Sequence, residues 1–186
     1  MTIPEELIMK HLNMLMTSAD PGDVMHHLHV VAAPAGAVSP LGLPDPGRLT
    51  TKVYAIAPTQ EVNAEEFIAK VVMTAAIESR RDGIQVLFAA LNQQVWAVDP
   101  MDALGHRLLR AGRLFEHPEV AEATVVYAAC RDGRRWQGQR WLTGPKAGTL
   151  EHVDLLVGQP ELSEGGMAGV LVRRLVGMGP DGDTVN

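Results

Sequence analysis

Residues 52–99 read KVYAIAPTQEVNAEEFIAKVVMTAAIESRRDGIQVLFAALNQQVWAVD, and this stretch decides the fold. Val53 to Ala57 is a short apolar run that Pro58 ends, which is typical of a strand. Residues 64–80 carry apolar side chains at helical spacing, and their adjacent rows form one wide stripe, so they predict an amphipathic helix. Gly83 is expected to end this helix, because a positive φ angle is least costly for glycine.

Two further features refine this stretch. Asn63 stands three residues before Glu66, so the pair predicts a capping box at the start of the helix. Ile84 to Leu91 is continuously apolar, as expected of a strand that is buried on both faces. Residues 92–94 are polar, and Val95 to Val98 resumes the apolar run. We expect a hairpin with a short polar loop here, with one long bent strand as the alternative.

The first helix is expected at the N-terminus. Residues 1–16 carry an apolar stripe, and Thr2 with Glu5 forms a second capping-box pattern. The stripe includes Leu7 and Leu12. We expect this helix to dock on the core, and oligomerisation through it stays open because a methionine-rich face suits adaptable binding.

Two more helices are expected later in the chain. Asp99 and Pro100 predict an N-cap and a first helical residue, and Gly112 predicts the end of that helix. Its Leu104, Leu108 and Ala111 are expected to face inward. Residues 167–176 favour a helix, although their β-branched content leaves a strand open.

Strands and irregular segments complete the chain. Asp132 and Gly133 give a strong hairpin signal between two of the strands. The expected strands cover 24–33, 124–130, 135–142 and 150–157, with a proline- and glycine-rich loop at 34–47 and a polar tail at 178–186. Strand pairs joined by short turns outnumber long crossovers, so residues 1–186 predict a single layered α+β domain with a mainly antiparallel sheet covered by three to four helices.

Composition limits the possible functions. The chain has 186 residues, a formal net charge of −6 and 46% hydrophobic residues. Such a charge argues against general affinity for nucleic acids or membrane surfaces. Cys130 is the single cysteine, so an internal disulfide is impossible. Since no apolar run reaches the length of a membrane span and no secretory signal is recognisable, we expect a protein of the cytoplasm or of a particle assembled there.

The strand at 24–33 carries a weak metal candidate. His27 and His29 project from the same face of a strand, which is the geometry of a two-histidine grip. His152 and Asp154 are a similar pair on another strand. A metal site needs three or four converging ligands, so we favour histidines on the solvated side of the strand and expect no cofactor.

The segment RDGRRWQGQRW, residues 131–141, is the main candidate for binding a partner. It combines cations and aromatic rings on an acidic chain, a mixture that anchors protein interfaces. The residues are Arg131, Arg134, Arg135, Trp136, Arg140 and Trp141. Strict alternation places the two tryptophans on opposite faces of the strand, unless Gly138 marks a bulge that reverses the alternation. A solvated hairpin whose charges protect a sheet edge is the simpler reading, and nucleic-acid binding is less expected.

Residues 151–179, EHVDLLVGQPELSEGGMAGVLVRRLVGMG, resemble the acyl-CoA-binding segment of the GNAT acetyltransferases. In that family an apolar strand leads through a glycine-rich turn into a helix whose N-terminal amides hold the pyrophosphate. Gly165, Gly166 and Gly169 stand where such a turn has its glycines. The resemblance implies a small acyl-CoA-dependent transferase.

We favour a different function from these observations. Cys130 lies in an apolar strand and reads as a core residue, and no serine lies in a nucleophile elbow. We therefore expect a non-enzymatic protein-interaction or assembly subunit that is oligomeric. Its contact surfaces would be the N-terminal helix and the Arg/Trp hairpin, and its partner a second copy or another subunit. The transferase is the alternative.

Overall fold

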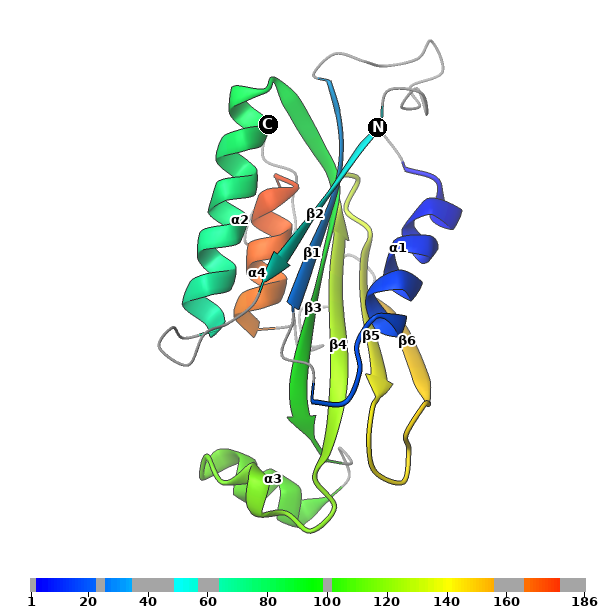
Figure 1. The fold of residues 1–186 in the computed structure, drawn as a ribbon, viewed down its shortest axis with the longest axis vertical. Helices are drawn as coiled ribbons and strands as arrows, with labels where there is room; N and C mark the ends of the chain where they lie inside the picture. The colour runs from blue at the N-terminus through cyan, green and yellow to red at the C-terminus, as the bar shows by residue number, and fades with distance from the viewer. Residues whose placement is uncertain are drawn as a thin grey trace.

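The computed structural model describes residues 3–22, 26–34, 49–56, 64–98, 102–155 and 166–177. Helices and strands follow one another along the chain as shown in Figure 1. Their order is α1 (Glu5–Thr17), β1 (His26–Pro34), β2 (Thr50–Ile56), α2 (Ala64–Arg81), β3 (Ile84–Ala97), α3 (Ala103–Arg110), the 3-10 turn η2 (Leu114–Glu116), β4 (Ala121–Cys130), β5 (Arg135–Trp141), β6 (Leu150–Leu155) and α4 (Gly166–Leu175).

One six-stranded sheet organises the described residues, in the order β2-β1-β3-β4-β5-β6. Every neighbouring pair of strands is antiparallel. Helix α1 covers one face of the sheet and α2 and α4 cover the other, while α3 lies beyond one end of the strands (Figure 1). This arrangement confirms the predicted α+β fold with an antiparallel sheet.

Each face of the sheet has its own core. On the α1 side, Ile8, Leu12 and Leu15 pack with Phe88 and Trp136. On the other side, Ile68 and Val72 of α2 and Val172 of α4 pack with strand residues that include Leu28 and Leu91. Strand β3 contributes to both cores, which confirms the prediction that its apolar run is buried on both faces. No helix in the described part of the chain is long and apolar enough to cross a membrane.

The hairpin predicted within residues 84–98 is wrong, and the alternative of one long strand is correct. β3 runs unbroken through its polar residues, with Asn92, Gln93 and Gln94 opposite three consecutive residues of β4. The polar side chains are accommodated without a turn. Asn92 is fully buried and accepts a hydrogen bond from the backbone N–H of His27, so it joins β3 to β1.

Several helix ends differ from the predicted ones. The capping box of Thr2 with Glu5 is wrong, because Pro4 occupies the N-cap of α1 and no side chain caps it. Helix α3 is capped by Asp102 and not by Asp99, since the Asp102 carboxylate accepts from the amides of Leu104 at 2.7 Å and Gly105 at 3.1 Å. Gly83, with a φ of +62°, ends α2 as predicted.

Other predicted segments were right to within a few residues or fall outside the described residues. Residues 167–176 form helix α4, not a strand. The caps expected from Asn63 and Ser163, most of the loop at 34–47 and the tail at 178–186 lie outside the described residues.

Candidate functional site

The two surfaces predicted to bind a partner contact each other within the chain. Nη2 of Arg134 donates to the carbonyl oxygen of Ile3 at 2.6 Å, just before α1 begins. Nη1 of Arg140 donates to the carbonyl oxygen of Met16 at 3.1 Å, in the last turn of α1. A cation at that end also interacts favourably with the helix dipole. The Arg/Trp hairpin therefore holds the N-terminal helix at both of its ends.

The apolar members of the two surfaces are buried as well. Leu12 is 1% exposed and Trp136 is 6% exposed, both in the core beneath α1, while Leu7 packs partly buried against the same core. Trp141 is 4% exposed and packs with Ala121 and Ala123 on the opposite face of the sheet. The tryptophans lie on opposite faces, as strict alternation predicted, and neither ring is open to a partner.

The remaining arginines of the hairpin also have internal roles. Nη1 of Arg131 donates to the carbonyl oxygen of Val176 at 3.2 Å, so it satisfies the C-terminal end of α4. Arg135 is 7% exposed within β5. Nη2 of Arg134 lies 2.8 Å from a carboxylate oxygen of Asp132, and its guanidinium stacks 5.5 Å from the ring centroid of Trp136.

The expectation that the strand histidines lie on the solvated side is wrong for His29, which is 5% exposed. His27 and His29 share the α1 side of the sheet, but Nδ1 of His29 lies 3.1 Å from Nδ1 of His11 on α1. His11 and His29 are both buried, and burial lowers the pKa of each imidazole, that of His29 to about 4. Within the described ranges no three histidine, cysteine or carboxylate side chains converge to hold a metal.

His117 and Asp102 form a pair that resembles part of a catalytic dyad. The geometry around this pair indicates a structural role. Nε2 of the buried His117 lies 2.9 Å from Oδ2 of Asp102. Its other ring nitrogen, Nδ1, accepts from the backbone N–H of Glu119 at 3.0 Å. These two contacts hold the imidazole between α3 and the backbone of Glu119. The pair links the start of α3 to the chain before β4.

The residues that carry the transferase resemblance lie in and before α4. Gly166 is the first residue of this helix and Gly169 is buried inside it, while Gly165 lies outside the described residues. Cys130 is buried, and burial raises the pKa of its thiol to about 12, which keeps it protonated and unreactive at neutral pH.

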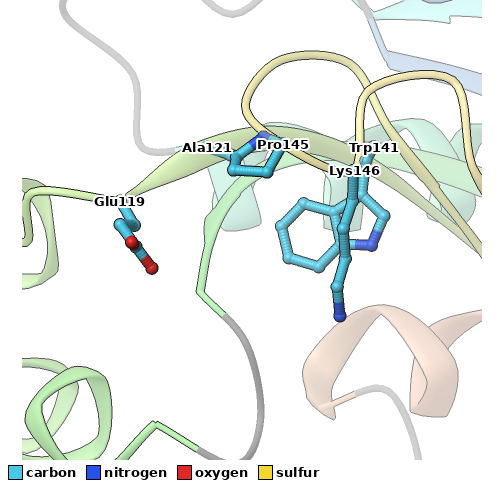
Figure 2. Close-up of a pocket in the computed structure, with 5 residues that line it drawn as sticks. All are labelled: Glu119, Ala121, Trp141, Pro145 and Lys146. Atoms are coloured by element: carbon cyan, nitrogen blue, oxygen red, sulfur yellow. The ribbon is translucent and has the colours of Figure 1, made fainter.

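A pocket of about 290 Å³ opens where the hairpin ends, and we call it the Trp141 pocket. Glu119, Ala121, Trp141, Pro145 and Lys146 line it. Figure 2 shows Glu119 on one side of the pocket, with the indole and Lys146 on the other. The ammonium of Lys146 lies 5.7 Å from the ring centroid of Trp141, within cation–π range.

The indole N–H of Trp141 is the unusual group in this pocket. Nε1 is buried, and no acceptor among the described residues bonds to it. A buried donor left without a partner costs about 1–3 kcal/mol. The sequence analysis selected Trp141 as a residue that binds a protein partner. It did not select Glu119 or Lys146, because no local sequence pattern marks them.

Among the described residues, several exposed large apolar side chains lie on α3 and the elements next to it. Trp96, Leu104, Leu109 and Phe115 are exposed there, on β3, α3 and η2, whose backbones contact one another. Together with Arg107 and Arg110 we call them the α3 surface. The prediction that Leu104 and Ala111 face inward is wrong, because only Gly105 of this helix is buried. A side-chain Cβ at residue 105 would lie 2.4 Å from Cγ2 of Val98, so glycine alone permits this close approach.

Comparison with known proteins gives no match: no family model, no curated protein and no solved structure is similar to this chain.

Proposed function

We propose that this protein is an interaction or assembly subunit that associates through the α3 surface. The observation that carries the proposal is the exposure of large apolar side chains on contacting elements, with Leu109 58% and Phe115 68% exposed. Exposed apolar side chains that gather at one place mark interaction sites more often than singly scattered ones do. The N-terminal helix and the Arg/Trp hairpin, which pack on each other, serve as scaffold in this proposal.

The charge of the α3 surface indicates the kind of partner. Residues 102–116 contain three arginines and the carboxylates Asp102 and Glu116, and Arg113 is paired with Glu116 at 2.6 Å, so Arg107 and Arg110 give the α3 surface its positive charge. The rest of the chain carries −7, the difference between the net charge of −6 and the +1 of these residues. A surface that is apolar and basic complements one that is apolar and acidic, so we take the partner to be an acidic face of a second copy.

This pairing has a consequence for assembly. Two different faces meet, so the contact is heterologous, and it generates rings or filaments instead of a two-fold dimer. Attraction between opposite charges is screened by salt, so association is expected to weaken as ionic strength rises. We place this assembly in the cytoplasm or in a particle formed there, in keeping with the single cysteine.

The experiment is light scattering after size exclusion over a range of concentrations. The wild-type chain is expected to exceed its monomer mass of 20.1 kDa at low salt. A double variant, Leu109→Ser with Phe115→Ser, is expected to run as a monomer. The matched control is Met73→Ser with Ile77→Ser, because these residues of α2 are each 61% exposed and lie outside the α3 surface.

Two results would overturn the proposal. The first is a wild-type chain that stays monomeric at every concentration and salt tested. The second is loss of association in the α2 control while the α3 variant still associates, which would move the interface to another face. Circular dichroism of both variants checks that they remain folded.

A further inference from the structure

Helix α1 is attached to the sheet by polar contacts at three places along its length. Arg134 and Arg140 of the hairpin donate to backbone carbonyl oxygens near its two ends. Midway between them, Nδ1 of His11 lies 3.1 Å from Nδ1 of His29 on β1. Arginine side chains stay charged in proteins, whereas histidine titrates close to neutral pH. Of these three contacts, the central one is therefore the one that mild acid can change.

The two imidazoles are enclosed between the helix and the sheet. His11 is 6% exposed and His29 is 5% exposed. Their rings meet edge to face with centroids 5.4 Å apart, and the ring of Phe88 lies 5.8 Å from that of His11. A hydrogen bond between two Nδ1 atoms needs a hydrogen on one and a lone pair on the other. The docked helix thus requires at least one neutral imidazole, because two imidazolium ions would turn their N–H groups against each other.

The charges that act on the pair oppose protonation. Lys10 precedes His11 on α1, and His27 shares the α1 side of β1 with His29. Burial lowers the pKa of both imidazoles; Lys10 lowers that of His11 further, and His11 and His27 lower that of His29 further. A proton that arrives at the pair therefore meets an apolar environment and positive neighbours.

The strands beneath α1 supply no negative charge to compensate that proton. β2 and β3 place Val53 and Ala90 opposite His29. β4 contributes Cys130 to this core, and burial raises the pKa of its thiol to about 12, so it stays neutral. β5 contributes the two arginines already named, which are cations.

The carboxylates of α1 itself stand away from the pair. Glu5 and Glu6 are exposed in the first turn, about 7–9 Å from His11 along the helix axis. Among the described residues, no carboxylate forms an ion pair with His11 or His29. Protonation of the two histidines is thus favoured only when the helix has left the sheet and water reaches both rings.

Release of α1 leaves the rest of the fold a complete framework. The six strands pair with one another and not with α1, and α2 and α4 cover the other face with a core of their own. From these contacts we propose that α1 is an acid-released cover, which leaves the sheet when His11 and His29 are protonated while the sheet, α2 and α4 stay folded. Release exposes the apolar face that Leu12 and Phe88 share. This device is separate from the α3 surface and does not depend on association of the chain.

Hydrogen exchange of the dilute full chain, followed by mass spectrometry and corrected for the intrinsic effect of pH on amide exchange, tests the proposal. The pKa of His29 is about 4 when the helix is docked and 6.5 when the ring is free in water. Lowering the pH from 7 to 5 is therefore expected to reduce the protection of residues 5–17 about twentyfold or more. At pH 5 these residues should also be at least about tenfold less protected than β3, whose amides exchange when the whole protein unfolds.

A double variant, His11→Gln with His29→Gln, separates this device from general sensitivity to acid. Its α1 protection should change less than about threefold between pH 7 and 5, because glutamine takes up no proton in this range. His106→Gln replaces an exposed histidine of α3 and is the matched control, which should keep the full wild-type response. Protection of β3 in each variant reports that the sheet is folded.

Three results would overturn the proposal. One is a change of less than about threefold in the α1 protection of the wild-type chain between pH 7 and 5. Another is equal protection of α1 and β3 at pH 5, since the helix would then open only when the whole protein unfolds. The last is a folded double variant that keeps the wild-type response, since other groups would then cause it. Should the double variant not fold, the comparison of α1 with β3 in the wild-type chain still decides.

Discussion

Nη1 of Arg140 lies 3.1 Å from the carbonyl oxygen of Met16, so a β5 side chain satisfies the last turn of helix α1. The contact joins residues 124 positions apart. Arg134 forms the matching contact with Ile3 near the start of the helix, at 2.6 Å. Cations from one hairpin thus determine where the N-terminal helix sits on the sheet.

We predict that removing either arginine destabilises the fold. Arg140→Gln or Arg134→Gln deletes a charged hydrogen bond to a carbonyl, which is worth about 1.5–3 kcal/mol of unfolding free energy. Urea unfolding followed by circular dichroism measures the loss. Arg110→Gln, on the exposed face of α3, is the control and should stay within about 0.5 kcal/mol of wild type. Equal effects of all three variants would contradict the assigned role.

Stability should fall in mild acid because of the pair His11 and His29. Burial lowers the pKa of His29 to about 4 from 6.5, so the unfolded chain binds its proton first as the pH falls. The contribution is complete above pH 6.5 and is lost between pH 6.5 and 4, by an amount on the order of 3 kcal/mol. Unfolding at a series of pH values measures it. In His29→Gln the unfolding free energy should fall less steeply with decreasing pH over this range. An unchanged dependence on pH would assign the loss of stability to other groups.

Helix α3 should detach when its close contact is filled. Gly105→Ala places a Cβ 2.4 Å from Cγ2 of Val98, where no Cβ fits. Either the Val98 side chain or the helix must shift, and we expect the helix to loosen, so that amide hydrogen exchange of residues 103–110 speeds up while that of β3 and β4 is unchanged. Ala103→Gly is the control, because it perturbs an exposed position of the same helix. Exchange that is faster throughout the protein would mean global destabilisation instead.

Cys130 should be unreactive in the folded protein. Its side chain is buried and burial raises the pKa of its thiol to about 12, so the thiolate is scarce at pH 8. Ellman's reagent should label it only after denaturation, with one equivalent per chain. Rapid labelling under native conditions would show that β4 opens.

Local signals in the sequence identified most of the fold. Helix α2 was predictable because its apolar stripe and Gly83 agree within one short segment. The hairpin expected around Asn92 failed for a different reason: a polar triplet usually marks a turn, yet here it pairs with β4 residues some thirty positions later. Pairing at that distance leaves no mark in the local pattern.

The candidate sites were less predictable than the fold. Trp136 and Arg140 were predicted to bind a partner, whereas in the structure they contact the same chain's N-terminal helix. The Trp141 pocket depends on the turn after β5 bringing Lys146 over an indole and on β4 placing Glu119 opposite. Since each of these residues is ordinary in its own segment, only the fold shows that they face one pocket.

The long separation between α1 and its arginines also affects synthesis. At about 5–20 residues per second, a ribosome needs roughly 6–26 s after Met16 or Ile3 is made before Arg140 or Arg134 follows. During that interval the nascent chain displays Ile8, Leu12 and Leu15 without the hairpin they will cover. The two arginine contacts at the ends of α1 therefore become available only after most of the sheet has been made, and a chaperone that shields the helix has a defined period in which to act.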